Sequence, residues 1–356
     1  MSVSGDDGLR LALDLERLEQ CLAVALPGFE GPIAARQFSG GQSNPTYRLD
    51  TPSGAYVLRR KPPGDLLPSA HAIDREYRVM AALGREGSPV PPVLHYCDDA
   101  DVIGAPFYLM RFVEGRVLFD TRLPGIAPAE RRMTYEALVD TLAALHRVDV
   151  GAAGLSDFGR PGGYIARQVA RWSKQYRASA GPEAPEGAGP VLAEMARLMD
   201  WLPDAVERLP DETCLVHGDY RLDNAMLAPD RPEVVAVLDW ELSTLGHPLA
   251  DLSYFLMTWA FPADLRWGLA EADLDTLGIP TMEAMAARYA AATGREAVAE
   301  LDLLIAYNAF RLAAILQGVY ARGLAGNAAD EAALGMGGDV PRLARIALDF
   351  AERAGA

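Results

Sequence analysis

Apolar residues recur along this chain at two different spacings, and the change from one to the other separates a strand-rich part from a helix-rich part. Near the N-terminus they are three or four residues apart, which predicts a helix ending at Pro27-Gly28, with an apolar stripe of Leu11, Leu15, Leu18, Leu22 and Ala25. Short β-prone runs follow at 34–38, 46–49, 55–60, 90–94 and 106–113. The turn residues at 51–54 join two of these runs as a hairpin, so we expect an antiparallel sheet.

Helical spacing returns once within this region, at 72–83, and then dominates from residue 130 onward. The later predicted helices cover 130–146, 191–208, 251–260, 281–292, 300–322 and 340–354. Glycine-rich stretches at 178–190 and 323–339 are expected to be loops. The pattern predicts an α+β fold. Residues 1–113 would form a small antiparallel sheet with one main helix, and residues 114–356 a larger, mostly helical part.

Composition narrows the class of protein. The chain has 356 residues, half of them apolar, which is enough for a large core, and we see no uninterrupted apolar stretch that would span a bilayer. Its net charge of −16 argues against nucleic acid or an anionic membrane as partner. The polar, acidic N-terminus does not resemble a signal peptide. Cys21, Cys97 and Cys214 are scattered without metal-ligand spacing, so we expect core thiols and a cytoplasmic location.

The strongest chemical signal is the segment from His217 to Asn224, which reads H-G-D-x-x-x-x-N and follows a short apolar run at 214–216. A second apolar run, at 233–238, leads into Asp239. An Asp, an amide five positions later and a second Asp behind a strand is the layout of protein-kinase-like phosphotransferases. Asp219 is suited to accept the proton of a substrate hydroxyl. Asn224 and Asp239 offer the hard oxygen ligands that Mg²⁺ prefers.

Upstream residues are suited to hold a nucleotide. Gly40 and Gly41, with Ser43 and Asn44 beside them, form a hairpin tip at which backbone amides can approach phosphates. The following strand carries basic side chains. Alternation puts Val57, Arg59 and Lys61 on one face. In the protein-kinase pattern V-A-I-K the small residue that faces adenine lies two positions before the Lys, as Val57 does before Arg59. Arg59 is therefore our first choice to contact the phosphates of ATP, and Lys61 the second.

Two further features complete the predicted nucleotide site. Glu76 lies on the expected helix at 72–83, where it would pair with the strand cation. Adenine would pair with backbone groups between Met110 and Val113, a stretch that includes Phe112, where the strand-rich part passes into the helical part.

These motifs resemble the aminoglycoside phosphotransferase and choline kinase superfamily, an atypical branch of the protein-kinase fold. The resemblance covers nearly the whole chain and includes the segments 142–146 and 246–252, in the second of which His247 replaces an acidic residue. It implies a bilobal kinase-like fold and an enzyme that moves the γ-phosphoryl group of ATP, with Mg²⁺, to the hydroxyl of a small molecule. Asp251 is expected to cap a helix, and His217 to brace the catalytic loop.

The segments 38–47, 56–64 and 71–77 are similar to the kinase-like domain fused to certain acyl-CoA dehydrogenases. That similarity implies a hydroxyacyl-CoA acceptor. A basic run on one predicted helix, Arg167, Arg171, Lys174 and Arg177, favours such an anion, although a solvated helix face would have the same sequence. Two alternatives stay open. One is an aminoglycoside O-phosphotransferase, and the other, suggested by an Arg where the family usually has Lys, is a non-catalytic nucleotide-binding scaffold.

Overall fold

The computed structural model describes residues 13–38, 44–62, 72–265, 268–326 and 331–356. The chain divides into two compact units. Unit 1 comprises residues 1–117, 151–155 and 224–243, and unit 2 comprises residues 118–150, 156–223 and 244–356. The first break lies close to the boundary predicted between residues 113 and 114. Two later segments join unit 1, however, and one of them, 224–243, carries Asn224 and Asp239.

Unit 1 is built on a five-stranded antiparallel sheet with the strand order β1-β2-β3-β5-β4. The strands are β1 (Ala34–Gln37), β2 (Thr46–Thr51), β3 (Gly54–Arg60), β4 (Val93–Cys97) and β5 (Phe107–Arg111). The helices of this unit are α1 (Leu15–Ala25), α2 (Ile73–Arg85) and the single turn α3 (Ala100–Ile103). The predicted hairpin turn is present between β2 and β3, where the Thr51 hydroxyl donates to the carbonyl of Gly54 at 2.9 Å.

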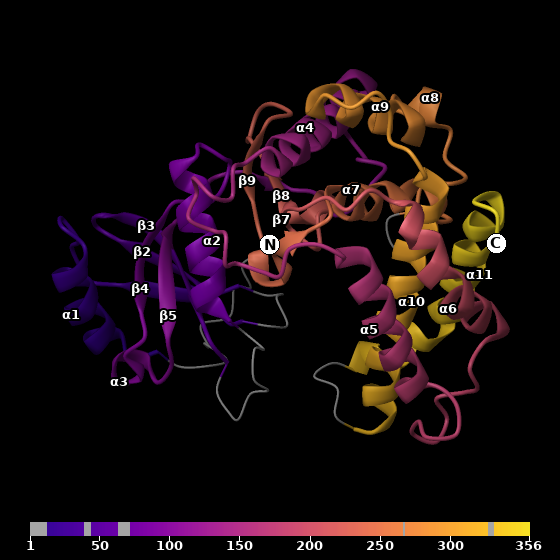
Figure 1. Ribbon diagram of the computed structural model, residues 1–356. Coiled ribbons are helices and arrows are strands. Elements are labelled where there is room, and N and C mark those ends of the chain that lie inside the picture. The colour runs from indigo at the N-terminus through magenta and orange to yellow at the C-terminus, as the bar shows by residue number, and fades with distance from the viewer. Residues whose placement is uncertain (1–12, 39–43, 63–71, 266–267, 327–330) are drawn as a thin grey trace. The chain divides into compact units, whose positions relative to one another are not determined.

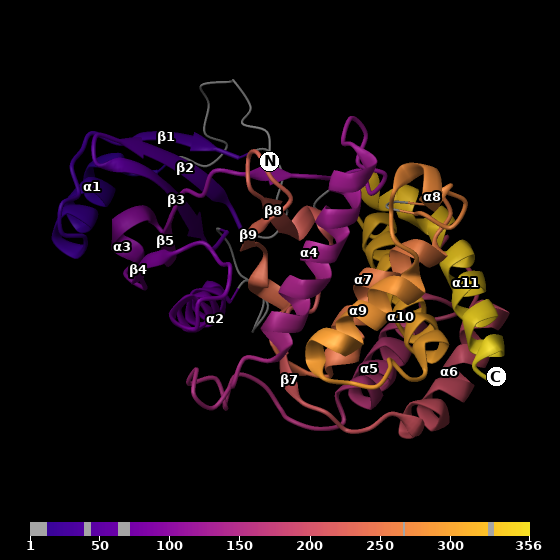
Figure 2. The same cartoon turned by 90° about the horizontal axis from the view of Figure 1, so that it is seen from above.

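The two faces of this sheet are covered by different helices, and the alternation along β3 decides which side chain meets which helix (Figures 1 and 2). Leu58 belongs to an apolar cluster that includes Leu18 and Leu22 of α1. Arg59, the next residue, turns to the opposite face and reaches Glu76 of α2. The sheet therefore presents an apolar face to α1 and a partly charged face to α2.

Residues 224–243 add a second, smaller sheet to unit 1, with the order β6-β8-β9. Its strands are β6 (Arg116–Val117), β8 (Ala225–Leu227) and β9 (Val234–Val237), and the short helix η3 (Trp240–Leu242) follows. β8 and β9 pair as a hairpin in which Ala225 lies opposite Val237. Asn224 and Asp239 therefore flank the same open end of the hairpin.

Unit 2 is mainly helical. Its longer helices are α4 (Pro128–His146), α5 (Tyr164–Ser179), α6 (Ala193–Ala205), α7 (Pro248–Leu256), α9 (Met282–Thr293), α10 (Leu301–Leu324) and α11 (Asp339–Arg353). Shorter elements are η1 (Val206–Arg208), η4 (Met257–Ala260), α8 (Leu274–Leu277) and η5 (Glu331–Gly338). β7 (Cys214–Val216) and β10 (Thr244–Gly246) form a two-stranded antiparallel pair. η2 (Leu222–Asn224) lies where the chain passes from unit 2 into unit 1.

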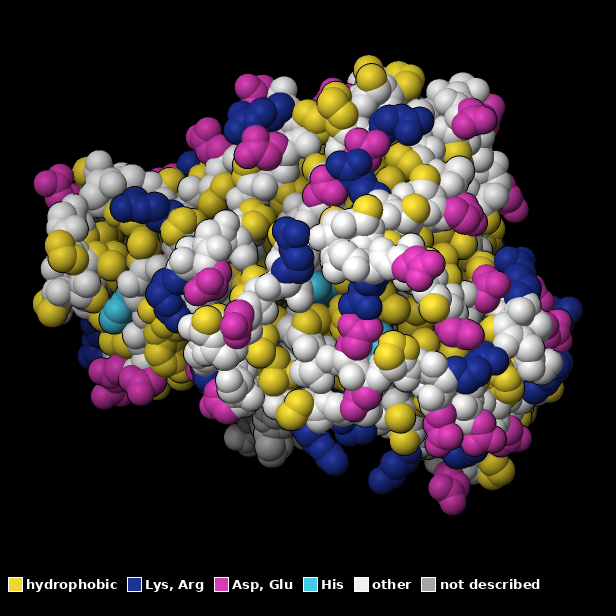
Figure 3. Space-filling model, turned by 45° about the horizontal axis from the view of Figure 1, so that its top comes forward, with side chains coloured by type: hydrophobic (Ala, Val, Ile, Leu, Met, Phe, Trp, Pro, Cys, Tyr) yellow, Lys and Arg dark blue, Asp and Glu magenta, His cyan; other side chains and the backbone are white. Residues whose placement is uncertain are grey.

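The centre of unit 2 is α10, which packs against α5, α7 and α11 (Figure 1). Among the described helices, α10 alone is long and apolar enough to cross a membrane by length and composition, which we did not expect from the sequence. Within the most apolar segment of α10, 72% is buried inside the protein, and helices in protein cores are buried in the same way. On the face shown in Figure 3, acidic and basic side chains alternate instead of separating by sign.

The α+β architecture predicted from the sequence is confirmed, and most expected elements appear within a few residues of their predicted bounds. One expectation was wrong. The stretch 323–339 is not simply a loose loop, because α10 continues to Leu324 and the described end of the stretch, 331–338, forms the 3-10 helix η5.

Candidate active site

Arg59 and Glu76 form a buried ion pair in unit 1. The Nε of Arg59 lies 2.9 Å from Oε2 of Glu76, and the two side chains are 12% and 1% exposed. β3 and α2 place these groups, as the sequence predicted. Removing one partner of a buried pair of this kind destabilises a protein by about 3–5 kcal/mol, because the other charge is left unpaired in the interior.

Glu76 is held by neutral donors as well. Asn44 donates from Nδ2 to Oε1 at 2.8 Å, and the Tyr108 hydroxyl donates to Oε2 at 3.0 Å. Burial raises the pKa of Glu76, and the charge of Arg59 and the two hydrogen bonds offset only part of that rise. Asn44, the described residue of the predicted phosphate-covering tip, is thereby tied to α2.

Arg59 also reaches the predicted metal ligand. Its Nη2 lies 3.0 Å from Oδ1 of Asp239 and 3.7 Å from Oε2 of Glu241. Asp239 has a φ of 65°, a left-handed backbone conformation that few residues other than glycine adopt. Strain of this kind is retained where the surrounding structure imposes it, often at functional sites. The sequence did not decide the role of Glu241. In the structure its carboxylate shares the guanidinium of Arg59 with the carboxylate of Asp239.

Asn224 is brought to the same end of the β8–β9 hairpin as Asp239. The amide of Leu238 donates to the carbonyl of Asn224 at 2.8 Å, one position before Asp239. An amide side chain and a carboxylate side chain therefore belong to one end of one small sheet, and both types carry oxygen atoms suited to Mg²⁺.

The glycine-rich tip and Lys61 were also predicted to contact the phosphates of the nucleotide. Gly40, Gly41 and Ser43 lie outside the described residues. Lys61 follows β3 directly and is half-buried, and its amide donates to the carbonyl of Pro106 at 3.1 Å. Of the two cations considered, Arg59 is the one paired with Glu76.

Met110 and Phe112 lie where β5 ends. Met110 lies opposite Val57 in the sheet, and the amide of Phe112 donates to the carbonyl of Ala55 at 3.1 Å. The guanidinium of Arg48 stacks 4.2 Å from the centre of the Phe112 ring. The segment expected to meet adenine is thus anchored to β2 and β3.

In unit 2, the loop that carries Asp219 is held on both sides of one residue, Gly218. Asp251 accepts hydrogen bonds from the amides of His217 and Gly218, at 2.5 and 2.8 Å. Arg311 of α10 donates to the carbonyl of Gly218 at 3.0 Å. Gly218 has a φ of 86°, so the turn that presents the next residue requires glycine.

Asp219 is bound by its neighbours in unit 2. Its amide donates to Nδ1 of His217 at 3.3 Å, so the expected bracing role of this buried histidine is present. Its carboxylate lies 3.5 Å from Nε of Arg221 and hydrogen-bonds to Tyr254. Burial, followed by the negative charge of Asp219, raises the pKa of Tyr254, so its hydroxyl keeps its proton and donates it.

The expectation that Asp251 caps a helix was wrong. The N-cap of α7 is His247, whose Nδ1 accepts from the amide of Leu249 at 3.2 Å while its Nε2 meets the carbonyl of Pro210 at 2.9 Å. Asp251 lies inside the helix, fully buried, and points to the catalytic loop. Burial alone would raise the pKa of Asp251, but the hydrogen bond and charge of His146, with the other contacts of the loop, lower it.

A cavity of about 180 Å³ opens in unit 2 beside two of the residues that hold Asp219. Arg221 and Tyr254 line it together with one acid, Asp339. The other lining residues are apolar: Phe261, Leu265, Leu312, Leu316 and Leu343. Its lining is suited to an apolar group near a hydroxyl that Asp219 could reach.

The basic run on α5 is divided by its contacts. Arg167 donates to the carbonyls of Gly162 and Arg160, so it is tied to its own loop. Arg171 stacks on Trp172 with 5.1 Å between the guanidinium carbon and the ring centre. Lys174 and Arg177 are exposed and line a cavity of about 310 Å³ between α5 and α6. The second half of the run, Lys174 and Arg177, is therefore the part that lines a cavity.

Comparison with known proteins places this geometry in context. The profile described as "Phosphotransferase enzyme family" matches residues 34–299. Mouse acyl-CoA dehydrogenase family member 10 is 44% identical over 348 residues, which is 97% of this chain but 32% of the mouse protein. The chain thus spans about a third of the length of that relative.

Solved structures show the same fold. A Ralstonia eutropha protein, described as a candidate aminoglycoside phosphotransferase, has a TM-score of 0.86 and 43% identity, covering 96% of this chain and 99% of its own. A spectinomycin phosphotransferase, solved with ADP and spectinomycin, has a TM-score of 0.63 at 12% identity, covering 97% of this chain and all of its own. The predicted kinase-like fold is confirmed.

Proposed function

This chain belongs to the phosphotransferase enzyme family and is a small-molecule kinase, and we propose that it moves the γ-phosphoryl group of ATP to a hydroxyl of an acyl-CoA ester with the help of Mg²⁺. The observation that carries the proposal is the network in which Arg59 joins Glu76 to Asp239. This network supplies a fixed cation for phosphates beside a carboxylate for a metal, all within unit 1.

The donor set of unit 1 fits Mg²⁺ bound to a nucleotide. Asp239 and Asn224 would hold the ion, which would neutralise charge on the phosphates. Arg59 would contact the phosphate oxygens while Glu76 keeps its guanidinium in place. The planar guanidinium of an arginine can donate two parallel hydrogen bonds to phosphate oxygens, whereas the lysine usual in the family supplies one point charge.

Asp219 of unit 2 would orient the acceptor hydroxyl and accept its proton. The contacts of Asp251 with the Gly218 amide and of Arg311 with the Gly218 carbonyl fix the position of the next residue, and Tyr254 fixes its carboxylate. Phosphoryl transfer depends mainly on such positioning and on charge neutralisation.

The cavity beside Asp219 favours an acyl acceptor over a sugar. Four of its lining residues are leucines and one is phenylalanine, and Arg221 is the cation among the lining residues. An aminoglycoside carries several positive charges and would need carboxylates, whereas this lining offers one, Asp339. The name of the mouse relative refers to acyl-CoA chemistry, in agreement with this choice.

Lys174 and Arg177 could meet the phosphates of the CoA moiety. They line the larger cavity of unit 2, and no acid is among its described lining residues: Ala166, Val169, Ala170, Ser173, Lys174, Arg177, Met199 and Pro203. An aminoglycoside acceptor is the second candidate, because the spectinomycin phosphotransferase with this fold binds such a compound.

A panel of acceptors tests the proposal. ADP formation would be measured with ATP and Mg²⁺ against hydroxyacyl-CoA esters, the matching esters without the hydroxyl, and a set of aminoglycosides, with the product identified by mass spectrometry. We expect turnover with the hydroxyacyl-CoA alone. Turnover confined to aminoglycosides would overturn the acceptor, and nucleotide binding without turnover on any acceptor would favour a scaffold.

A further inference from the structure

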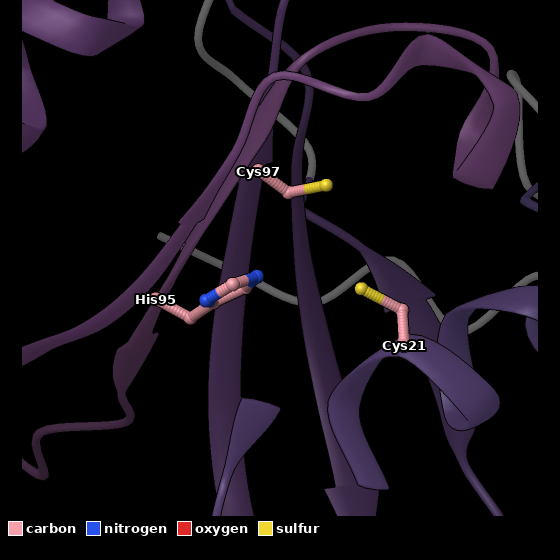
Figure 4. A group of neighbouring side chains, drawn as sticks. All are labelled: Cys21, His95 and Cys97. Carbon is pink, nitrogen blue, oxygen red and sulfur yellow. The ribbon is translucent and has the colours of Figure 1, made fainter. Parts of the chain in front are cut away.

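The side chains of two cysteines and one histidine lie close together on the face of the unit 1 sheet that is covered by α1. Cys21 lies on α1, and His95 and Cys97 lie two positions apart on β4, so both point to the same side of that strand. One ligand atom from each residue lies within 4.8 Å of the others. Figure 4 shows the three side chains extending into the same space, with the imidazole beside the two sulfur atoms.

We propose that these three residues bind a thiophilic divalent cation, with Zn²⁺ as the natural occupant. Zinc takes thiolate and imidazole ligands at about 2.0–2.3 Å in a tetrahedral arrangement, which puts neighbouring ligand atoms about 3.8 Å apart. The observed cluster lies within about an ångström of that spacing, so small side-chain movements would close it. The site could not be recognised from the sequence, because Cys21 is far from the other two ligands along the chain.

The surroundings suit a structural metal. Cys97 is buried in the apolar cluster that includes Leu18 and Leu22, and the ring of His95 packs edge-on to Phe107 at 6.3 Å. Two thiolates would cancel the charge of Zn²⁺, so a closed site would carry no net charge into this interior.

A bound ion would fasten α1 to β4. Helix α1 otherwise adheres mainly through apolar contacts such as those of Leu18 and Leu22. Arg59 and Glu76 occupy the opposite face of the same sheet, so the ion would act on the stability of unit 1 and not on phosphoryl transfer. The fourth position would be taken by water or by a backbone oxygen; the carbonyl of Asp99 lies 3.9 Å from the sulfur of Cys97.

Cobalt binding tests the inference on the full chain without any assay of activity. The reduced, chelator-treated protein would be titrated with Co²⁺ alone, whose thiolate charge-transfer and d–d bands report sulfur ligation and tetrahedral geometry, and Zn²⁺ would then be added to displace it. The variants are Cys21→Ser, Cys97→Ser and His95→Asn. Cys214→Ser is the matched control, because Cys214 is a buried cysteine of unit 2.

We expect one Co²⁺ per chain, bands lost with either serine variant, weakened bands with His95→Asn and unchanged bands with Cys214→Ser. Zinc should raise the melting temperature of the wild type and of Cys214→Ser. Circular dichroism would show that each variant is folded, and zinc-dependent protection of two thiols from alkylation in the wild type gives a second readout. Absence of the bands, their persistence in a folded Cys21→Ser variant, or a Cys21–Cys97 disulfide that forms with Zn²⁺ present would overturn the inference.

Discussion

Asp219 is the residue on which the chemistry of the proposed reaction depends. Its carboxylate is held by Tyr254 and lies near Arg221, so replacing it with Asn changes the charge and the basicity but little of the shape. We expect Asp219→Asn to lower kcat by about 10²–10⁴-fold, the usual contribution of a positioned base. Nucleotide affinity, measured by calorimetry, should stay within about twofold. A variant that retains wild-type turnover on the true acceptor would contradict this role.

Asp251 contributes to stability through its charge. Its lowered pKa means that the folded state favours the carboxylate more than the unfolded chain does. The stability it supplies is therefore fully present above its ordinary pKa of 3.8 and is lost as the pH falls through the lower value of the folded state. Asp251→Asn removes an acceptor from the His217 and Gly218 amides, and should reduce the free energy of unfolding at pH 7 by about 1.5–3 kcal/mol.

Urea unfolding of the wild type and of Asp251→Asn between pH 7 and pH 3 measures this effect. The difference between the two proteins should be constant from pH 7 to about pH 5 and should shrink below pH 4. Asp264→Asn is a suitable control, because that carboxylate has a lowered pKa too but is exposed and paired with Arg342. A pH-independent difference would show that Asp251 acts through shape alone.

At the scale of elements, periodicity predicted the longer helices and strands well, because those elements bury one face. Shorter ones gave no such signal. β6 has two residues, β8 and β10 have three each, and they exist because other strands pair with them. The single-turn helices α3 and α8 depend on Asp99 and Asp273 as N-caps, which local sequence reading did not single out.

The candidate site divides in the same way. Residues in ordered motifs, such as Asp219 and Asp239, could be found by spacing, and the Arg59–Glu76 pair by analogy with the kinase layout. The brace from Asp251 was missed because an acid in the first turn of a helix has the sequence signature of a cap. The cluster of Cys21 with β4 was missed because tertiary folding alone brings α1 to that strand.

The exposed half of the basic face of α5 gives a prediction at this scale. Lys174→Ala and Arg177→Ala should each raise KM for a CoA-ester acceptor by about two- to five-fold, the usual strength of an exposed charge interaction, and the effect should fade at high salt. The value of kcat should not change, because both residues line a different cavity from the one beside the residues that hold Asp219. Arg197→Ala removes an equal charge from α6, where Arg197 pairs with Glu352, and serves as the control. Equal effects of all three would indicate general electrostatics.

At the scale of the whole molecule, the two units hold different parts of the proposed reaction. All described residues assigned to the nucleotide and its metal lie in unit 1, including Asn224 and Asp239, which return to it late in the chain. The residues assigned to the acceptor, Asp219 and its cavity, lie in unit 2. A single boundary in the sequence could not show this, because residues 224–243 follow the main part of unit 1, residues 1–117, only after more than a hundred intervening residues.

This division predicts that kinetic defects sort by unit. Arg59→Lys keeps the charge but replaces two separate donors, Nε on Glu76 and Nη2 on Asp239, by a single nitrogen. It should therefore lower kcat/KM for ATP by about tenfold or more, the loss of one charge-assisted hydrogen bond. Leu316→Trp fills the apolar cavity and should raise KM for the acyl acceptor while KM for ATP stays unchanged. Met133→Trp, an exposed position on α4, controls for added bulk. Steady-state kinetics with each substrate varied in turn measures both. An acceptor KM left unchanged by Leu316→Trp would place the acyl group elsewhere and return the sugar acceptor to consideration, without affecting the nucleotide assignment of unit 1.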